Sequence, residues 1–363
     1  MKILLCGDVS PTVDNRELFS QGDVQALFND TAKLFVDRDV CIVNLECALT
    51  ESENPIQKIG PAIKAPLGTA QTLAKLGVTH CSLANNHFFD YGRKGAKDSM
   101  EALDAAGIGY TGFGENEADS RNNLVIEKDG QSLCVIAVCE HEYSYALEDR
   151  MGSRPFDVID TAEDIKAAKS KYDRVVVLFH GGKEHCRYPS PRLRKVCHLM
   201  AKCGADVILC QHSHCIGCYE EIESCHILYG QGNFHFGKLA HLDKPGWFDC
   251  LAVHYDTVSG EIKFIPVTGD KKIGIQLANE TESQQILDAF AARNKQLADG
   301  TWIDGWRQFC EDYREQYTKI AVQAFDPEFG ERAIERFRHY IDCEAHLDVW
   351  KEIFKTWNHT NEK

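Results

Sequence analysis

The sequence is poor in features that would place it in several common classes of protein. Basic residues are in deficit, since 40 Lys and Arg face 55 Asp and Glu and the net charge is -15. This balance disfavours non-specific binding to nucleic acid or to an anionic membrane surface, because both carry negative charge. No stretch is long and apolar enough for a transmembrane helix. We therefore predict no nucleic-acid partner and no membrane span.

A secretion signal is also lacking. The first apolar stretch, residues 3–6, is too short for the hydrophobic segment of a signal peptide. We therefore expect a cytoplasmic protein. The 16 cysteines lie mostly within apolar runs, and in that compartment we expect reduced thiols that pack as small apolar side chains. Cys215 and Cys218 form a C-x-x-C pair, but no second pair completes a structural zinc site.

Short apolar runs alternate with segments of helical periodicity over the first 270 residues, which predicts an α/β fold. The expected strands cover residues 2–6, 39–45, 78–83, 174–179 and 205–210, with hairpins over 124–138 and 250–266. The expected helices cover residues 22–35, 69–76, 95–106, 162–170 and 193–203.

The character of the chain changes after about residue 280. Residues 282–298, 305–324 and 328–346 have helical periodicity, with aromatic residues spaced to form a stripe. Such a stripe is more often core than a ligand-binding surface, so we expect these helices to pack against the α/β body. We predict two domains, residues 1–275 and a helical extension over residues 276–363.

Side chains that can bind metal ions follow several of the predicted strands. They are Asp8, Glu46, Asn86 with His87, His180, and the pair His212 and His214. The carboxyl ends of the strands in an open α/β sheet are the usual place for its chemistry. Two histidines two residues apart on an extended segment would face the same side. The mixture of carboxylate, amide and imidazole favours a divalent transition metal over calcium. Each residue alone could be a polar loop residue or a cap, so the prediction depends on their combination.

Taken in order, these segments resemble the motifs of the CapA family of poly-γ-glutamate capsule proteins, within the calcineurin-like metallophosphoesterase superfamily. The resemblance covers roughly residues 1–270. It is carried by Gly7-Asp8, Asn44-Leu45-Glu46, Asn85-Asn86-His87 with Asp90-Tyr91-Gly92, His180-Gly181-Gly182, Gln211-His212-Ser213-His214 and Gly232-Asn233-Phe234. It implies a four-layer α/β/β/α metallophosphoesterase-like sandwich with a C-terminal helical extension.

The resemblance also implies roles for individual residues. Glu46 would bridge one or two ions of Mn, Zn or Fe. Asp8 and His214 would hold one ion, and Asn86, His180 and His212 the other. His87 would be a non-ligand histidine that protonates the leaving group or stabilises the transition state. The sequence departs from the superfamily pattern at Ser10, where a histidine is usual, at Glu46, where the bridge is usually aspartate, and at Gln211, where glycine is usual.

Candidate substrate-binding residues lie near these motifs. Lys183 and Arg187 begin a basic patch, with Arg192, Arg194 and Lys195. The patch could be a solvated helix start or could bind phosphate or carboxylate. Asn233 could orient a loop or bind substrate. His185 and His235 match no ligand position, and we expect both to be ordinary structural histidines.

Two functions remain open from the sequence. The first is a metal-dependent hydrolase acting on an anionic substrate, a γ-glutamyl amide polymer or a phosphoester, linked to poly-γ-glutamate or capsular polysaccharide metabolism. The second is a non-catalytic component of capsule biosynthesis that binds polymer or partner proteins.

Overall fold

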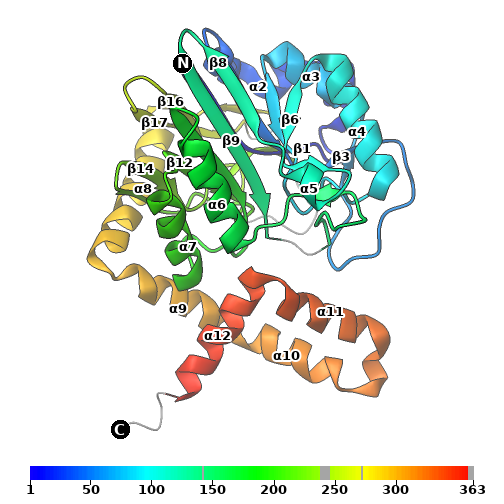
Figure 1. The fold of residues 1–363 in the computed structure, drawn as a ribbon. Coiled ribbons are helices and arrows are strands. Elements are labelled where there is room, and N and C mark those ends of the chain that lie inside the picture. The colour runs from blue at the N-terminus through cyan, green and yellow to red at the C-terminus, as the bar shows by residue number, and fades with distance from the viewer. Residues whose placement is uncertain (141–142, 238–245, 271–272, 359–363) are drawn as a thin grey trace.

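The computed structural model of the chain describes residues 1–140, 143–237, 246–270 and 273–358. Two β-sheets pack face to face, and helices cover the outer face of each (Figure 1). The predicted α/β/β/α sandwich is therefore confirmed. The helices over residues 302–358 lie at one end of the sandwich (Figure 1).

The larger sheet has the strand order β18-β17-β16-β1-β2-β5-β6, with β15 also paired to β1. Strands β1, β2, β5, β6 and β15 pair with their neighbours in parallel. Strands β16, β17 and β18 extend the sheet from β1 by antiparallel pairing. Their bounds are β1 Lys2–Ser10, β2 Val40–Leu45, β5 His80–Ser82, β6 Gly109–Thr111, β15 Asn233–Phe236, β16 Cys250–Asp256, β17 Ile262–Gly269 and β18 Ile275–Leu277.

The second sheet has the order β13-β14-β12-β11-β9-β8. Its centre, β14-β12-β11-β9, is parallel, and a hairpin adds an antiparallel strand at each edge. The bounds are β8 Leu124–Lys128, β9 Gln131–Cys139, β11 Arg174–His180, β12 Val207–Gln211, β13 Tyr219–Ile222 and β14 Cys225–Leu228. Two small pairs lie outside the sheets, β3 Ala48–Leu49 with β4 Lys64–Ala65, and β7 Phe113–Gly114 with β10 Gly152–Ser153.

Alternating side chains separate the apolar core into layers. In β1, Ile3 and Leu5 belong to the core between the sheets, while Leu4 belongs to the core under the first helices. In β11, Val176 lies between the sheets and Val177 faces the outer helices. Both faces of these strands are buried, which explains why their sequences read as continuous apolar runs.

The outer helices are α1 Arg16–Gln21, α2 Val24–Phe28, α3 Gly68–Leu76, α4 Gly92–Ala106, α5 Glu117–Ser120, α6 Val158–Lys169 and α7 Pro191–Lys202. The single helix predicted over residues 22–35 is wrong. Gly22 ends α1 with φ 74°, Asn29 ends α2 with φ 44°, and the 3-10 helix η1 Asn29–Phe35 follows. Positive φ values cannot continue a right-handed helix, so the segment breaks at both positions.

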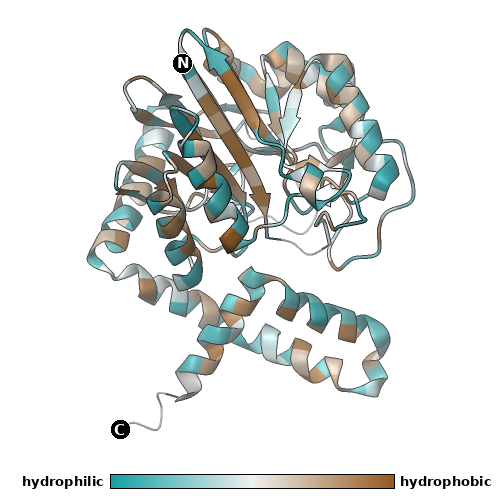
Figure 2. Cartoon of the chain, in the orientation of Figure 1, coloured by the Kyte–Doolittle hydropathy of each residue, from teal (hydrophilic) through white to brown (hydrophobic). Residues whose placement is uncertain are grey.

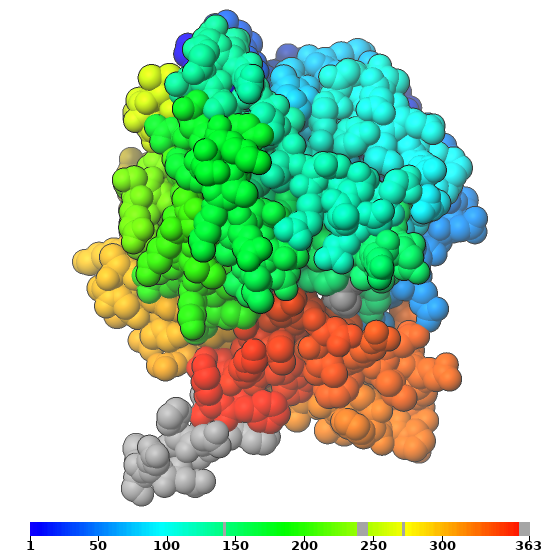
Figure 3. All heavy atoms as spheres, in the orientation of Figure 1, coloured from blue at the N-terminus to red at the C-terminus, as the bar shows by residue number. Residues whose placement is uncertain are grey.

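The C-terminal region consists of α8 Glu280–Asp299, α9 Trp302–Asp312, α10 Arg314–Ala324, the 3-10 turn η2 Pro327–Phe329, α11 Gly330–Asp342 and α12 Glu344–Asn358. The helix predicted over residues 328–346 is divided into α11 and α12, because Cys343 between them has an extended backbone. Trp306, Tyr317 and Trp350 join the core on the outer side of the second sheet, so the aromatic stripe packs as expected. Space-filling shows these helices against the end of the sandwich (Figure 3).

Hydrophilic residues are concentrated on the helices, and the strands are largely apolar (Figure 2). Among the residues that the structure describes, no helix combines the length and apolar character needed to cross a membrane. The boundary at residue 275 falls within β18, the last strand of the large sheet, and the helices begin at Glu280. The division into two domains stays a prediction.

Candidate metal centre

The predicted ligands come from strands of both sheets and meet at one end of the sandwich. Asp8 is on β1, Glu46 directly follows β2, and His180 ends β11. His212 and His214 follow β12, and Asn86 lies in the loop after β5. Parallel strands place their carboxyl ends at one edge, which brings these distant segments together. The spatial convergence predicted from the sequence is therefore present.

Two overlapping groups of side chains have the geometry to hold cations. Asp8, Glu46 and His180 form one group, and Glu46, His212 and His214 form the other, with potential ligand atoms within 4.8 Å of one another in each group. Glu46 belongs to both groups, the position expected for a bridging carboxylate. Asn86 joins the first, since its Oδ1 lies 2.9 Å from His180 Nε2. The assignment of each ligand to a particular ion stays a prediction.

The two buried acids of this centre differ in their partners. Asp8 accepts hydrogen bonds from Asn44 and from the His212 amide, whereas Glu46 Oε1 lies 3.5 Å from His180 Nε2. Glu46 is fully buried, and neither of its carboxylate oxygens accepts a hydrogen bond from a described residue. Burial, reinforced by the charge of Glu46, raises the pKa of Asp8 to about 7. Burial likewise raises the pKa of Glu46 to about 7 and lowers that of His180 to about 4. A divalent cation would stabilise the carboxylate charges, and the oxygen and nitrogen donors suit Mn, Zn or Fe.

Asn44 holds two of the candidate ligands in place. Its Nδ2 donates to Asp8 Oδ1 at 2.8 Å and lies 3.1 Å from His180 Nδ1. Asn85 in turn donates to Asn44 Oδ1 at 3.0 Å and to the Leu45 carbonyl at 2.9 Å. The sequence analysis gave Asn44 no role, although its position beside Glu46 at a strand end was a usable signal.

The H-x-H segment does not have the extended backbone predicted for it. His212 has φ 79° and His214 has φ 54°, in the left-handed region that non-glycine residues rarely adopt. The two imidazoles nevertheless belong to the same ligand group, with Glu46. The turn brings them together, and not the alternation of side chains along a strand. Such strained backbone is often found at functional sites. The backbone at Gly7, beside Asp8, also passes close to Gly232. A Cβ on Gly7 would lie 2.2 Å from the Gly232 carbonyl oxygen.

His87 belongs to a separate polar cluster beside the metal ligands. Its Nδ1 lies 2.7 Å from Asp90 Oδ2, and Lys58 forms an ion pair with the other oxygen of Asp90. Burial acts to raise the pKa of Asp90, but the charges and hydrogen bonds of His87 and Lys58 hold it below its usual value. Asp90 therefore remains ionised and fixes the orientation of the imidazole. Sequence analysis named His87 but missed Lys58, which lies in an irregular loop far from any motif.

The remaining predicted residues occupy different positions. Asn233 is buried beneath His214, with Oδ1 2.8 Å from His214 Nδ1, and its amide donates to the Trp247 carbonyl. Lys183 lines the cavity described below, whereas Arg187 is absent from its lining. The substrate-binding roles of these three residues stay predictions. His235 packs among Phe19 and Phe28 in the core, as expected of a structural histidine.

The predicted basic patch is divided by ion pairs. Arg192 contacts Glu140 at 2.6 Å and Asp348 at 2.9 Å, which ties α7 to α12. Arg194 contacts Glu220 at 2.7 Å on β13. These arginines are neutralised by structural partners, so they do not form a common anion-binding surface with Lys183.

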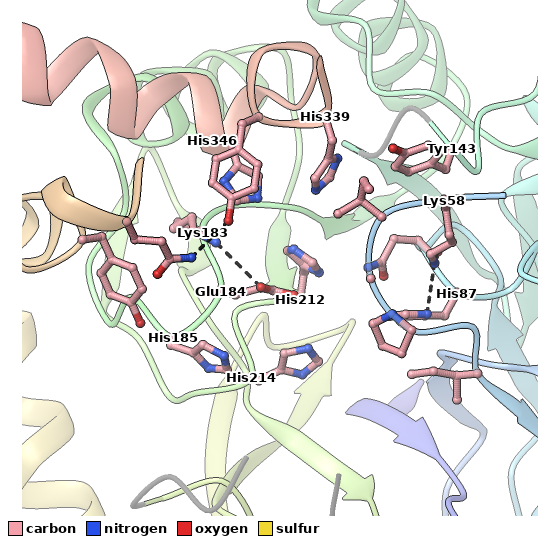
Figure 4. A pocket seen from close by; sticks show the side chains of 18 of the residues that line it. Lys58, His87, Tyr143, Lys183, Glu184, His185, His212, His214, His339 and His346 are labelled. Atoms are coloured by element: carbon pink, nitrogen blue, oxygen red, sulfur yellow. Dashed lines mark hydrogen bonds and ion pairs between the residues drawn. The ribbon is translucent and has the colours of Figure 1, made fainter. Parts of the chain in front are cut away.

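A cavity of about 430 Å³ opens over the metal ligands and His87. His212, His214 and Glu184 lie at its centre in Figure 4, with Lys58 and His87 on one side and Lys183 on the other. The C-terminal helices form another wall through Tyr317, Tyr340, His339 and His346. The aromatic stripe in the sequence predicted packing alone for these helices and gave no sign of this contribution. His185, expected to be an ordinary structural histidine, also lines the cavity.

The two packed sheets and the buried oxygen and nitrogen donors at their strand ends define an α/β/β/α sandwich protein with a candidate metal centre. Residues 2–238 match the family described as bacterial capsule synthesis protein PGA_cap, and the chain belongs to this family. The recognition made from the sequence motifs is thereby confirmed.

Two relatives with CapA names agree with the family assignment. The chain is 29% identical over 249 residues to the capsule biosynthesis protein CapA of Bacillus anthracis, covering 66% of this chain and 60% of that protein. It is 25% identical to the PGA biosynthesis protein CapA of Bacillus subtilis, covering 64% and 62%. The chain thus spans about three fifths of the length of these relatives. Among solved structures, a putative 5'-nucleotidase from Staphylococcus aureus aligns with 15% identity and a TM-score of 0.45, over 82% of this chain and 58% of that one.

Proposed function

We propose that the protein is a metal-dependent hydrolase that acts on an anionic substrate of poly-γ-glutamate or capsular polysaccharide metabolism. The single observation that carries the proposal is Glu46, a fully buried carboxylate without a described hydrogen-bond donor and shared by two groups of ligands. A buried charge in this situation is costly unless a cation neutralises it. The family membership supports the link to capsule metabolism.

Asp8, Glu46, Asn86, His180, His212 and His214 would hold one or two divalent ions. When bound, such ions supply Lewis-acid polarisation of the scissile carbonyl or phosphoryl group and a nucleophile at neutral pH. Asn44 would keep Asp8 and His180 in position, and Asn233 would do the same for His214. These contacts fix the tautomer and ring orientation of ligands and strengthen metal binding.

His87 would serve as the general acid. Asp90 accepts a hydrogen bond from Nδ1, so a proton on Nε2 of the imidazolium is the one available for transfer. That proton would pass to the leaving amine or alkoxide as its bond breaks, and the Asp90 carboxylate would stabilise the cationic ring until transfer. Lys58 would position Asp90 and contribute positive charge near an anionic substrate.

The choice between a γ-glutamyl amide and a phosphoester remains open, because both reactions develop oxyanion charge. The test is turnover of γ-glutamyl oligopeptides and of p-nitrophenyl phosphate by purified protein reconstituted in turn with Mn, Zn and Fe. The proposal expects metal-dependent turnover of one substrate class that is lost in His87→Ala while bound metal is retained. Absence of turnover with every ion and both substrate classes would count against it.

Ser10 favours a second candidate, a non-catalytic polymer-binding component. It occupies the place of a histidine usual in the superfamily, on the same strand as Asp8. This candidate expects metal and polymer binding without turnover in the wild type, and a gain of phosphatase activity in Ser10→His. Turnover by the wild type comparable to that of Ser10→His would discard it.

A further inference from the structure

The cavity has a second charged region, distinct from the ligand cluster and the His87 loop. Lys183 follows His180 by three residues and lines the cavity wall near the C-terminal helices (Figure 4). Its side chain is 8% exposed. Its ammonium group carries three hydrogen-bond donors and one positive charge.

The contacts of Lys183 leave its hydrogen-bond donors unused. Its Nζ forms an ion pair with Glu184 Oε2 at 3.7 Å, which is too long for a hydrogen bond, and Nζ donates no hydrogen bond to a residue in the described part of the chain. Lys58, the other lysine of the cavity, is fully engaged by comparison. It pairs with Asp90 and donates to the Asn86 carbonyl at 2.9 Å. Lys183 is therefore the lysine of this cavity that is suited to bind an external anion.

The wall facing this region is polar and internally hydrogen-bonded. Tyr317 Oη lies 2.6 Å from His346 Nδ1, and the Tyr340 ring packs 3.9 Å from the imidazole of His346. Gln316 donates to Tyr340 Oη at 3.2 Å. Among the described lining residues, Glu184 is the one carboxylate facing two lysines and several imidazoles. This local balance is opposite to that of the whole chain, whose net charge is -15.

We propose that the region between Lys183 and helices α10–α12 is a second anion subsite, where Lys183 binds a carboxylate or phosphate remote from the bond that is cleaved. This inference rests on the proposed function and extends it to the class of substrate. The substrate carries at least two anionic groups, one at the metal ligands and one at Lys183. The helical wall lies outside the part of the chain that matches the family, residues 2–238, whereas Lys183 lies within it.

The test is isothermal titration calorimetry on the metal-free full-length chain, with tri-γ-glutamate and pyrophosphate as separate probes. Lys183→Met is compared with Lys351→Met, an exposed lysine of α12 with the same change of charge. We expect one probe to bind about tenfold or more weakly to Lys183→Met, with Lys351→Met within about twofold of wild type. The probe that responds identifies the anion as carboxylate or phosphate. Equal affinities in all three proteins, or no binding of either probe to the wild type, would overturn the subsite.

A second pair of variants avoids dependence on a buried substitution. Gln316→Glu places a carboxylate on the exposed side of the cavity wall, while Gln323→Glu places one two turns further along the same helix, outside the cavity. Only Gln316→Glu should weaken the responding probe, and equal effects of the two would contradict the proposal. Probe binding that depends on Lys183 without hydrolysis by the wild type would leave the subsite standing and remove the hydrolase. Metal-dependent hydrolysis by the wild type, together with probe binding that does not depend on Lys183, would support the hydrolase and remove the subsite.

Discussion

The imidazole of His87 is held by the carboxylate of Asp90, with 2.7 Å between Nδ1 and Oδ2, three residues apart on one loop. Lys58 and the Ile63 amide bind the same carboxylate. The imidazole is thus fixed from one side, and its other nitrogen is available to the cavity that it lines. This arrangement separates the proton-transfer group from the metal ligands, so the two can be tested independently.

Replacing His87 with alanine should reduce kcat by about 10²–10⁴-fold, the usual contribution of a general acid. The metal content should stay at the wild-type value, because His87 is outside both ligand groups. Steady-state kinetics and metal analysis on the same preparation check both statements. His80→Ala, on the strand that leads to this loop, is the control and should retain near wild-type turnover. Retention of most activity by His87→Ala would show that another group supplies the proton.

In the absence of metal, Glu46→Gln should become more stable than the wild type as pH rises. The folded-state pKa of Glu46 is about 7 against an ordinary 4.5, so the fold favours the protonated acid. The stability associated with that protonated form is complete below pH 4.5 and lost as pH rises through 7. Relative to Glu46→Gln, the free energy of unfolding of the wild type should therefore fall by about 3 kcal/mol across this range.

Urea unfolding of both proteins in the presence of a chelator, from pH 4.5 to 7.5, measures this difference. Glu127→Gln, an exposed carboxylate on β8, should give a curve parallel to the wild type. Excess metal should reverse the order at pH 7.5, because the ion binds the ionised carboxylate of the wild type. A Glu46→Gln curve parallel to that of the wild type in metal-free buffer would contradict the raised pKa that burial gives Glu46.

The amide of Asn44 should matter for metal affinity although it is no ligand in either group. Asn44→Ala removes the contacts to Asp8 and His180, and loss of such supporting contacts typically weakens metal binding about 10–100-fold. Competition titration with a chromophoric chelator measures the change. Asn15→Ala is the matched control, since Asn15 is also buried but contacts Thr12 and His235 outside the ligand groups. Equal metal affinities for Asn44→Ala and the wild type would show that Asp8 and His180 do not need the Asn44 contacts to bind metal.

Much of the sandwich was predictable because buried parallel strands have a distinctive sequence. The runs around Val176 and Ile208 are continuous and β-branched, and polar residues follow them at once. The H-x-H backbone was not predictable, because the left-handed φ values of His212 and His214 come from tertiary packing rather than from local propensity. The role of α10–α12 was missed for a similar reason. Tyr317 and Tyr340 have helical spacing typical of core residues, and only the fold shows that they also face the cavity.

The partly buried ion pairs of Arg192 should hold α12 onto the sandwich. Arg192→Met leaves Glu140 and Asp348 without their shared cation, and because Arg192 is 24% exposed we expect a cost of about 2 kcal/mol, below that of a fully buried pair. Urea unfolding measures the loss. Arg338→Met, which removes an exposed pair with Asp342 within α11, should cost less than about 1 kcal/mol. Similar losses for the two variants would mean that the Arg192 network is no more than a surface interaction.

The most direct measurement is the metal content of the purified chain, by inductively coupled plasma mass spectrometry after reconstitution with Mn, Zn or Fe and removal of unbound ions. The account predicts between about one and two equivalents per chain, lost in the double variant Glu46→Gln with His212→Ala and retained in His87→Ala. Less than about half an equivalent of every ion in the wild type, or the same content in the double variant, would contradict it.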